Sequence, residues 1–275
     1  MRKFLKLSRL VPIGMLLLAP AAASAQDEPA TAPRVDSTVT SSRERLFLNF
    51  SEDAMITDEQ WWEGWLQYDD RDEVDRTILF GQAAFQIWVN TEIGVRVGFG
   101  RTDNAPPLDE GNGATDLEAW GKYYWNLGND RTELAAGVIL TVPSGDDSVG
   151  LGFDAFALKG FGAVRYRLST VILTGNVGLQ LNEDGQTLNS GELQGETAFS
   201  VGAGVIAPWS DSFSFVGELT WEQSRFEEID DGEAQLLGGL NLRLTNRGIL
   251  RPAVAVGLQD GSPDWQIYLG YAYVF

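Results

Sequence analysis

The chain has 275 residues, of which 44% are hydrophobic and 21% are charged, a composition that is typical of one ordered domain and excludes a mainly disordered chain. Lysine and arginine number 20 against 39 acidic residues, and the net charge of -19 argues against nucleic acid as a partner. The sequence has no cysteine and no histidine, which excludes disulfides, thiolate metal sites and every mechanism that needs an imidazole. We therefore expect no metal site and no cofactor.

The first 25 residues have the pattern of an export signal. Basic residues at the start precede an apolar stretch at 10–20, and Ala23-Ser24-Ala25 forms an A-x-A cleavage site. The apolar stretch is short for a membrane span, so an uncleaved anchor is the weaker alternative. We predict cleavage after Ala25 and export from the cytoplasm.

Residues 26–57 are predicted to form a flexible periplasmic arm or a short N-terminal segment. The part up to residue 45 is rich in Ser, Thr, Pro and Ala, without aromatic residues or periodicity. Residues 46–60 are ambiguous. Ser51 could cap a short helix that tucks into a lumen, but a simple tether to the membrane is the preferred interpretation.

From residue 58 to the end, segments of about ten residues alternate in polarity with period two, separated by Gly, Asn, Asp and Pro. We predict an all-β fold, an up-and-down antiparallel transmembrane β-barrel of about 12 strands. The predicted strands are 61–68, 77–89, 92–101, 115–126, 132–142, 155–168, 171–181, 196–207, 213–223, 233–245, 249–259 and 264–275.

The connections between these strands alternate between long and short. Residues 69–75, 102–114, 144–154, 183–195 and 224–232 are long, with 260–263 the one modest member of this set, and the connections between them are short. Outer-membrane barrels have short periplasmic turns and longer extracellular loops. The order of the connections therefore predicts that both ends of the barrel lie in the periplasm.

The alternation alone also fits a soluble sandwich or barrel with its apolar face inward. Aromatic residues near the strand ends favour the membrane, where they would form two interfacial girdles. The predicted girdle residues are Phe213, Trp221, Trp265, Tyr271, Tyr273 and Phe275. The aromatic chain end resembles the C-terminal strand signature that the outer-membrane barrel assembly machinery recognises, so we expect this machinery, membrane lipid and lipopolysaccharide as partners.

On the membrane interpretation, the polar faces of the strands line the interior. The candidate lumen-lining residues are Glu92, Arg96, Glu118, Lys122, Glu133, Lys159, Arg165, Arg167, Glu218, Arg243 and Arg251, and Glu63 and Glu222 share these faces. A bilayer enforces such segregation, since Arg or Lys at the lipid midplane costs about 2–4 kcal/mol. The charges fit either ion pairs that rigidify the wall or a solute pathway.

Much of the excess negative charge is predicted to lie in two loops, 69–75 and 227–231. Solvated acidic loops are the preferred interpretation over calcium sites, because neither loop has the ligand spacing of an EF-hand. Bridging of divalent ions to neighbouring lipopolysaccharide stays an alternative.

Three short motifs carry a family resemblance. They are GNGATD at 111–116, KYYW at 122–125 and VPSGD at 142–146. Together they resemble the phenol meta-pathway (MetA) outer-membrane proteins, which typically show a glycine-rich turn with Asp, a Lys-Tyr strand and a Pro-Thr-Gly-Asp-like loop. Ser144 replaces the Thr here, and the resemblance covers residues 111–184. It implies an outer-membrane barrel, often labelled a transporter of aromatic or other apolar compounds, and it assigns no functional residue.

We predict a channel or transporter for small solutes, with aromatic or apolar cargo implied only by the resemblance. A structural or surface-interaction barrel without transport is the alternative. An outer-membrane hydrolase is less favoured, because histidine is missing, although Glu118 and Glu133 could in principle form an acid and base pair. We therefore predict that the protein is not an enzyme.

Overall fold

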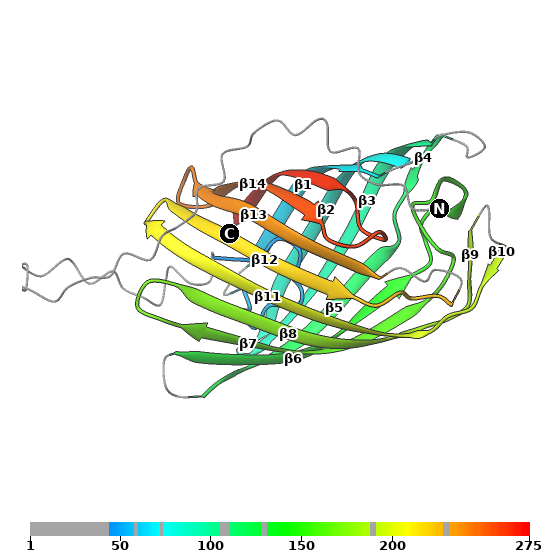
Figure 1. Ribbon diagram of the computed structural model, residues 1–275. Coiled ribbons are helices and arrows are strands. Elements are labelled where there is room, and N and C mark those ends of the chain that lie inside the picture. The colour runs from blue at the N-terminus through cyan, green and yellow to red at the C-terminus, as the bar shows by residue number, and fades with distance from the viewer. Residues whose placement is uncertain are drawn as a thin grey trace, which may run out of the picture. The chain divides into compact units, whose positions relative to one another are not determined.

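The computed structural model describes residues 44–57, 60–71, 74–104, 110–127, 131–187, 191–227 and 232–275. The predicted export signal, its cleavage site and residues 26–43 lie outside these ranges, as do several acidic loop residues: Asp72, Glu73, Glu228, Asp230 and Asp231. The described residues form a closed antiparallel β-barrel (Figure 1).

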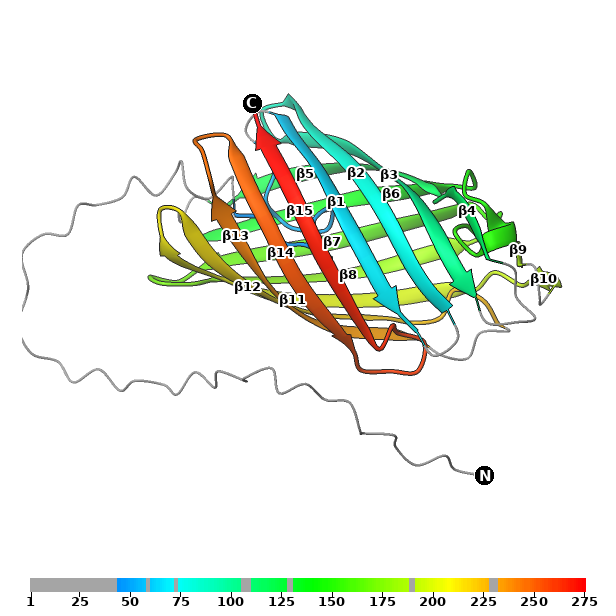
Figure 2. The same ribbon diagram turned by 90° about the horizontal axis from the view of Figure 1, so that it is seen from above.

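Twelve strands make up the ring. They are β1 (Gln60–Asp70), β2 (Val74–Trp88), β3 (Thr91–Asn104), β5 (Leu117–Asn126), β6 (Thr132–Val142), β7 (Ala157–Arg167), β8 (Ile172–Asn182), β11 (Thr197–Ser210), β12 (Phe213–Glu222), β13 (Glu233–Arg243), β14 (Gly248–Gly257) and β15 (Trp265–Val274). Each pairs with the next, and β1 closes the ring because Trp61 lies opposite both Ala84 of β2 and Val274 of β15 (Figure 2). The predicted 12-stranded up-and-down barrel is confirmed.

Three further short strands lie outside the ring. β4 (Gly111–Ala114) pairs with the end of β3, which continues as far as Asn104, and β9 (Gly185–Thr187) pairs with β10 (Gly191–Leu193) in a separate hairpin. These strands occupy connections that the sequence predicted as loops. β4 forms because β3 continues beyond its pairing with β5 and has a free edge there, to which β4 pairs.

The predicted alternation of connections holds with one difference. β1 and β2 extend until only residues 71–73 separate them, so the first predicted long loop is short. Asp69 consequently lies in β1 and is buried, where a solvated loop residue was expected. The backbone N–H of Phe275 donates to Gln60 O at 3.1 Å, so the start and the end of the ring meet at the end with the short turns.

Apolar side chains point out of the ring and polar side chains point in. In β15, Ile267, Leu269 and Tyr271 are exposed, whereas the intervening Gln266 and Tyr268 are buried. β7 and β12 alternate in the same way. The alternation along each strand therefore places the apolar face on the outside of the barrel, as predicted.

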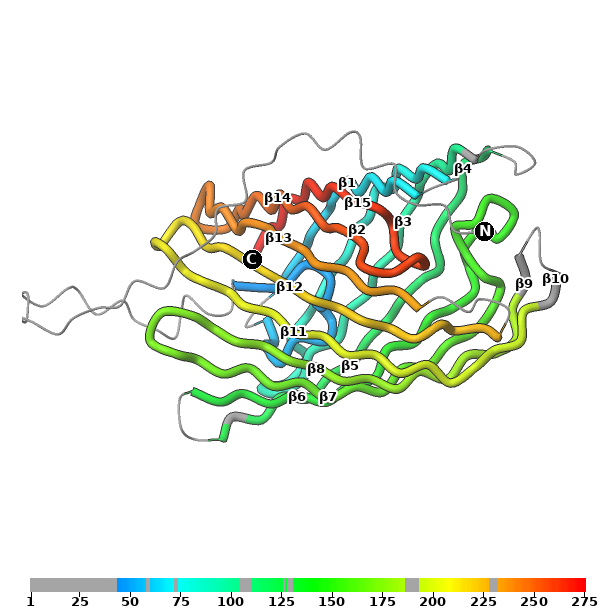
Figure 3. Tube along the Cα trace, in the orientation of Figure 1, coloured from blue at the N-terminus to red at the C-terminus, as the bar shows by residue number. Residues whose placement is uncertain are grey.

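The segment before the barrel, residues 44–57, lies inside it. Figure 3 shows this inner segment as the blue tube enclosed by the strands. Its apolar side chains Leu46 and Phe50 and its charged residues Arg45 and Asp53 are all buried. The structure therefore matches the alternative in which this segment is tucked into the lumen. It differs from the preferred interpretation of a simple tether to the membrane. Ser51 begins no helix, since the segment consists of turns and bends.

Within the described ranges, no helix has the length and apolar character needed to cross a membrane.

The outward face of β15 can be tested with a charge. Leu269 lies midway along β15 with 53% of its surface exposed, so Leu269→Arg should lower the free energy of unfolding in lipid vesicles by about 2–4 kcal/mol. Leu258→Arg is the matched control, because Leu258 is equally exposed (54%) but follows the end of β14. Urea titration measures both variants, and equal losses of stability would contradict the lipid-facing assignment.

Candidate functional site

An ionic cluster around Glu92 of β3 holds the inner segment. Glu92 Oε2 lies 3.2 Å from Arg45 Nη1, and Glu92 Oε1 lies 3.2 Å from Lys122 Nζ of β5. Glu92 also accepts the backbone N–H of Thr57 at 2.7 Å and the indole N–H of Trp120 at 3.2 Å. The three charged side chains are fully shielded from solvent, so one carboxylate balances two cations, one from the inner segment and one from the wall.

Glu218 of β12 is a second anchor, and it binds backbone. Its carboxylate accepts the N–H groups of Phe47, Leu48 and Asn49, the last two at 3.1 and 3.0 Å, and the side-chain amide of Asn49 at 3.1 Å. Hydrogen bonds to an ionised carboxylate are stronger than neutral ones. Three consecutive N–H groups converging on one carboxylate therefore fix the turn at residues 47–49.

Acidic residues of the inner segment also meet cations of β7. Lys159 Nζ lies 2.7 Å from Glu52 Oε1 and 3.3 Å from Glu222 Oε2, and Arg165 Nη1 lies 3.6 Å from Asp53 Oδ2. Lys159 and Arg165 are two of the predicted interior residues. Their partners in the inner segment were not predicted from the sequence.

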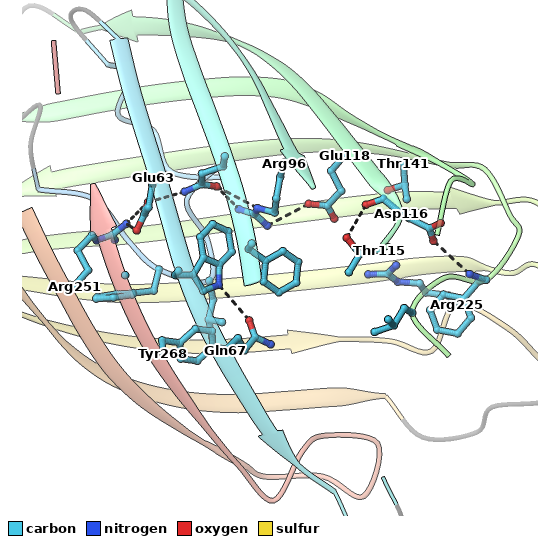
Figure 4. Close-up of a pocket in the computed structure, with 18 residues that line it drawn as sticks. Glu63, Gln67, Arg96, Thr115, Asp116, Glu118, Thr141, Arg225, Arg251 and Tyr268 are labelled. Carbon is cyan, nitrogen blue, oxygen red and sulfur yellow. Dashed lines mark hydrogen bonds and ion pairs between the residues drawn. The ribbon is translucent and has the colours of Figure 1, made fainter. Parts of the chain in front are cut away.

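A row of polar side chains crosses neighbouring strands of the wall (Figure 4). Arg251 Nη1 lies 2.6 Å from Glu63 Oε1, and Gln82 Nε2 donates to Glu63 Oε2 at 2.8 Å. Arg96 donates to Gln82 Oε1 from Nε and Nη2 at 3.1 and 3.0 Å, and its Nη1 lies 3.2 Å from Glu118 Oε2. Strand register produces the row, because Glu63, Gln82, Arg96 and Glu118 are successive cross-strand partners.

Gly270 of β15 makes room for this row. It is the register partner of both Arg251 and Trp65, so it lies between Arg251 and the strand that carries Glu63. A Cβ atom at this position would lie 3.3 Å from Glu63 Oε1 and 3.2 Å from Trp65 Cβ. A glycine therefore lets the Arg251–Glu63 ion pair reach across β15.

The row borders two adjoining cavities of about 260 and 400 Å³, which we call the vestibule. Leu151, Phe153 and Arg225, from the long connections, line both cavities, so the vestibule lies toward that end of the barrel. Leu48 of the inner segment also lines both cavities. The inner segment therefore forms part of the vestibule wall.

Aromatic side chains face the vestibule as well as the lipid. The rings of Trp65 and Phe80 stack with centroids 4.8 Å apart, and the guanidinium of Arg96 lies 5.5 Å from the Trp65 ring. Tyr268 completes this wall. The role of these rings was not predicted from the sequence, although Trp65 shares a strand face with Glu63 and Gln67, which is the available signal.

The motifs that carry the family resemblance fix the long connection after β6. Asp116 Oδ1 accepts the N–H groups of Gly145 and Ser144 at 2.8 and 3.2 Å, and Asp116 Oδ2 accepts that of Phe153 at 3.3 Å. Ser144 Oγ in turn accepts the N–H of Leu117 at 2.9 Å. A Cβ at position 145 would lie 2.7 Å from Asp116 N, so the glycine permits this close approach. These contacts hold Phe153 at the vestibule.

One ion pair stands at the end of β12. Arg225 Nε lies 2.8 Å from Glu222 Oε1, and this carboxylate raises the pKa of the Arg225 guanidinium above its usual value. Arg225 therefore stays charged where it lines the vestibule.

The remaining predicted interior residues lie apart from the vestibule. Arg167 Nη2 lies 2.7 Å from Glu133 Oε1, and the shielded Nε of Arg243 has no hydrogen-bond partner among the described residues.

Glu118 and Glu133 lie far apart. Glu118 lies opposite Thr141, which is eight residues along β6 from Glu133, so the two carboxylates are roughly 27 Å apart. Paired catalytic carboxylates lie roughly 5–10 Å apart, so the suggested acid and base pair is wrong.

The predicted girdle residues all lie on the outward face or beside it. Ring contacts join Tyr273 to Phe275 at 4.8 Å, Trp265 to Tyr68 at 5.1 Å and Trp221 to Phe199 at 6.2 Å. Phe213 packs on Phe215 at 4.5 Å, and Tyr271 is exposed nearer the middle of its strand. In the described part of the chain, no group of acidic residues has the arrangement of a metal site.

Comparison with known proteins finds likeness in structure alone. No family model and no curated protein matches the chain. The COG4313 outer membrane channel from Pseudomonas putida F1 has a TM-score of 0.69 at 15% identity, over 78% of this chain and 95% of that one. The NanC porin has a TM-score of 0.57 at 10% identity, over 78% and 100%. The KdgM porin, solved with disordered oligogalacturonate, has a TM-score of 0.52 at 10% identity, over 78% and 99%. The chain therefore shares the fold of outer-membrane channels and porins.

Removing the central carboxylate tests the ionic cluster. Glu92→Ala leaves Arg45 and Lys122 buried without their anion, so the free energy of unfolding should fall by about 3–5 kcal/mol. Glu110→Ala is the control, since Glu110 pairs with Arg101 at the exposed surface and its loss should change stability little. Urea titration in detergent measures both. A Glu92→Ala variant as stable as the control would contradict the mutual dependence of the inner segment and the wall.

Proposed function

We propose that the protein is an outer-membrane channel that admits small solutes through the vestibule. The single observation that carries this proposal is a closed wall with an apolar exterior and a charged interior that opens into a cavity toward the long connections. The fold shared with outer-membrane channels and porins supports it. Lipid, lipopolysaccharide and, through the strand ending at Phe275, the barrel assembly machinery are the proposed partners, and the aromatic girdles are proposed to meet the membrane interfaces.

Aromatic or partly apolar solutes are the proposed cargo. The stacked Trp65 and Phe80 rings, with Phe153 and Tyr268, offer flat apolar surface beside the polar row. The proposal agrees with the cargo implied by the resemblance to the phenol meta-pathway proteins. Membership of that family is part of the proposal.

A barrel without transport is the second candidate, and one observation favours it. The inner segment lies inside the barrel, binds several strands of the wall and lines the vestibule. Passage therefore requires either a residual path beside this segment or its displacement. The two candidates differ in whether releasing the segment changes flux.

Conductance distinguishes them. Glu218→Gln removes the charge that binds the three N–H groups at 47–49, so in planar bilayers it should raise conductance several-fold over the wild type. Efflux of tyrosine from loaded liposomes should rise in parallel, and Glu110→Gln, an exposed change of the same type, should match the wild type. If no variant exceeds protein-free membranes, the channel proposal fails and the barrel without transport is favoured.

A further inference from the structure

Arg76 of β2 lines the larger vestibule cavity without an ion-pair partner among the described residues. It makes no hydrogen bond and no ion pair with any residue of the described ranges, and its Nε is shielded from solvent. The other basic residues of this cavity, Arg71, Arg96, Lys159 and Arg225, each have a carboxylate within 3.3 Å. Among the basic residues that line this cavity, Arg76 is therefore the one without an ion pair to a described residue.

Two further donors near Arg76 also lack partners. Arg71 uses its terminal nitrogens on Gly261 O and Glu233, but its shielded Nε is unpaired. Thr102, the register partner of Arg76 on β3, is buried with an unpaired hydroxyl. Hydrogen-bond donors of three side chains are thus left unused in one region of the wall.

The carboxylates of Asp69 and Glu233 both attract Arg76, but neither forms an ion pair with it, and Glu233 pairs with Arg71 instead. Asp69 is its register partner on β1, but the Asp69 carboxylate accepts the amide of Gln67, at 2.9 and 3.2 Å, and forms no ion pair with Arg76. Arg76 is partly buried, and its shielded Nε has no acceptor among the described residues, which is costly. An anionic ligand would supply the missing acceptor, and the planar fork of Arg suits a carboxylate in particular.

The surface beside Arg76 suits an apolar body. Ile78 and Phe80, the next inward positions of β2, pack with Leu151 and line the same cavity as Arg76. A Cβ added at Gly150 would lie 3.6 Å from Arg76 Nη2, so this connection lies beside the guanidinium. The cavity of about 400 Å³ lies within the range of small-molecule sites, roughly 300–1,000 Å³.

We propose that the vestibule binds small monocarboxylates with an apolar or aromatic body, with the carboxylate on Arg76 and the body against Phe80 and Leu151. The assignment rests on the proposed channel function for its role in uptake. Binding itself is independent of passage and is measured separately.

Calorimetric titration of the full chain in detergent tests the proposal, with benzoate and its uncharged analogue benzamide as probes. The wild type should bind benzoate more tightly than benzamide. Arg76→Gln should weaken benzoate binding about tenfold or more without changing that of benzamide, and Arg76→Lys should recover part of the loss. Retained β-sheet circular dichroism and an unchanged benzamide affinity establish that each variant is folded.

Arg101→Gln is the matched control. Arg101 lies on β3 and pairs with Asp103 and Glu110 at the exposed surface, so its loss removes the same charge outside the cavity. It should leave both affinities unchanged. Equal binding of the two probes by the wild type, unchanged benzoate binding by Arg76→Gln, or an equal loss in Arg101→Gln overturns the proposal. The channel proposal fails on a different result, the absence of conductance and flux.

Discussion

The structure depends on the neutralisation of charges that the barrel wall places inside itself. Glu92, Lys122 and Arg165 are fully shielded; Glu92 and Lys122 pair within the wall, whereas the ion pair of Arg165 is to Asp53 of the inner segment. The inner segment supplies Arg45 and Asp53 as counter-charges and its backbone N–H groups to Glu218. The segment and the wall therefore form one electrostatic unit, in which removing either side leaves buried charge uncompensated.

The vestibule follows a different rule. Most of its polar row is satisfied within the wall, because register brings Glu63, Gln82, Arg96 and Glu118 together. Arg251, at one end of the row, also donates to the inner segment, at Arg45 O and Leu46 O. Aromatic rings and Arg76 then face the same space. A cation without an ion pair among the described residues, next to apolar side chains, is an arrangement that favours ligand binding over simple rigidity.

The strands were predictable because a period of two follows from local geometry, and each of the twelve predicted segments overlaps an observed strand. The sense of the faces was predictable because a bilayer penalises charge on one side only. A segment tucked into the lumen was one of two alternatives, but its contacts were not predictable, since residues 44–57 have no period and Glu218 lies 169 positions from the Asn49 amide it binds. The extension of β1 and β2, the vestibule rings and the isolation of Arg76 likewise depend on register and long-range packing, which composition and spacing do not encode.

Hydrogen exchange of the folded protein in lipid nanodiscs tests the central claim most directly. If the inner segment completes the charges of the wall, peptides that cover residues 44–57 will exchange about as slowly as those of the strands, because the N–H groups at 47–49 are bound to Glu218. Exchange of these peptides at the rate of an unstructured chain, with the strands protected, would contradict the account.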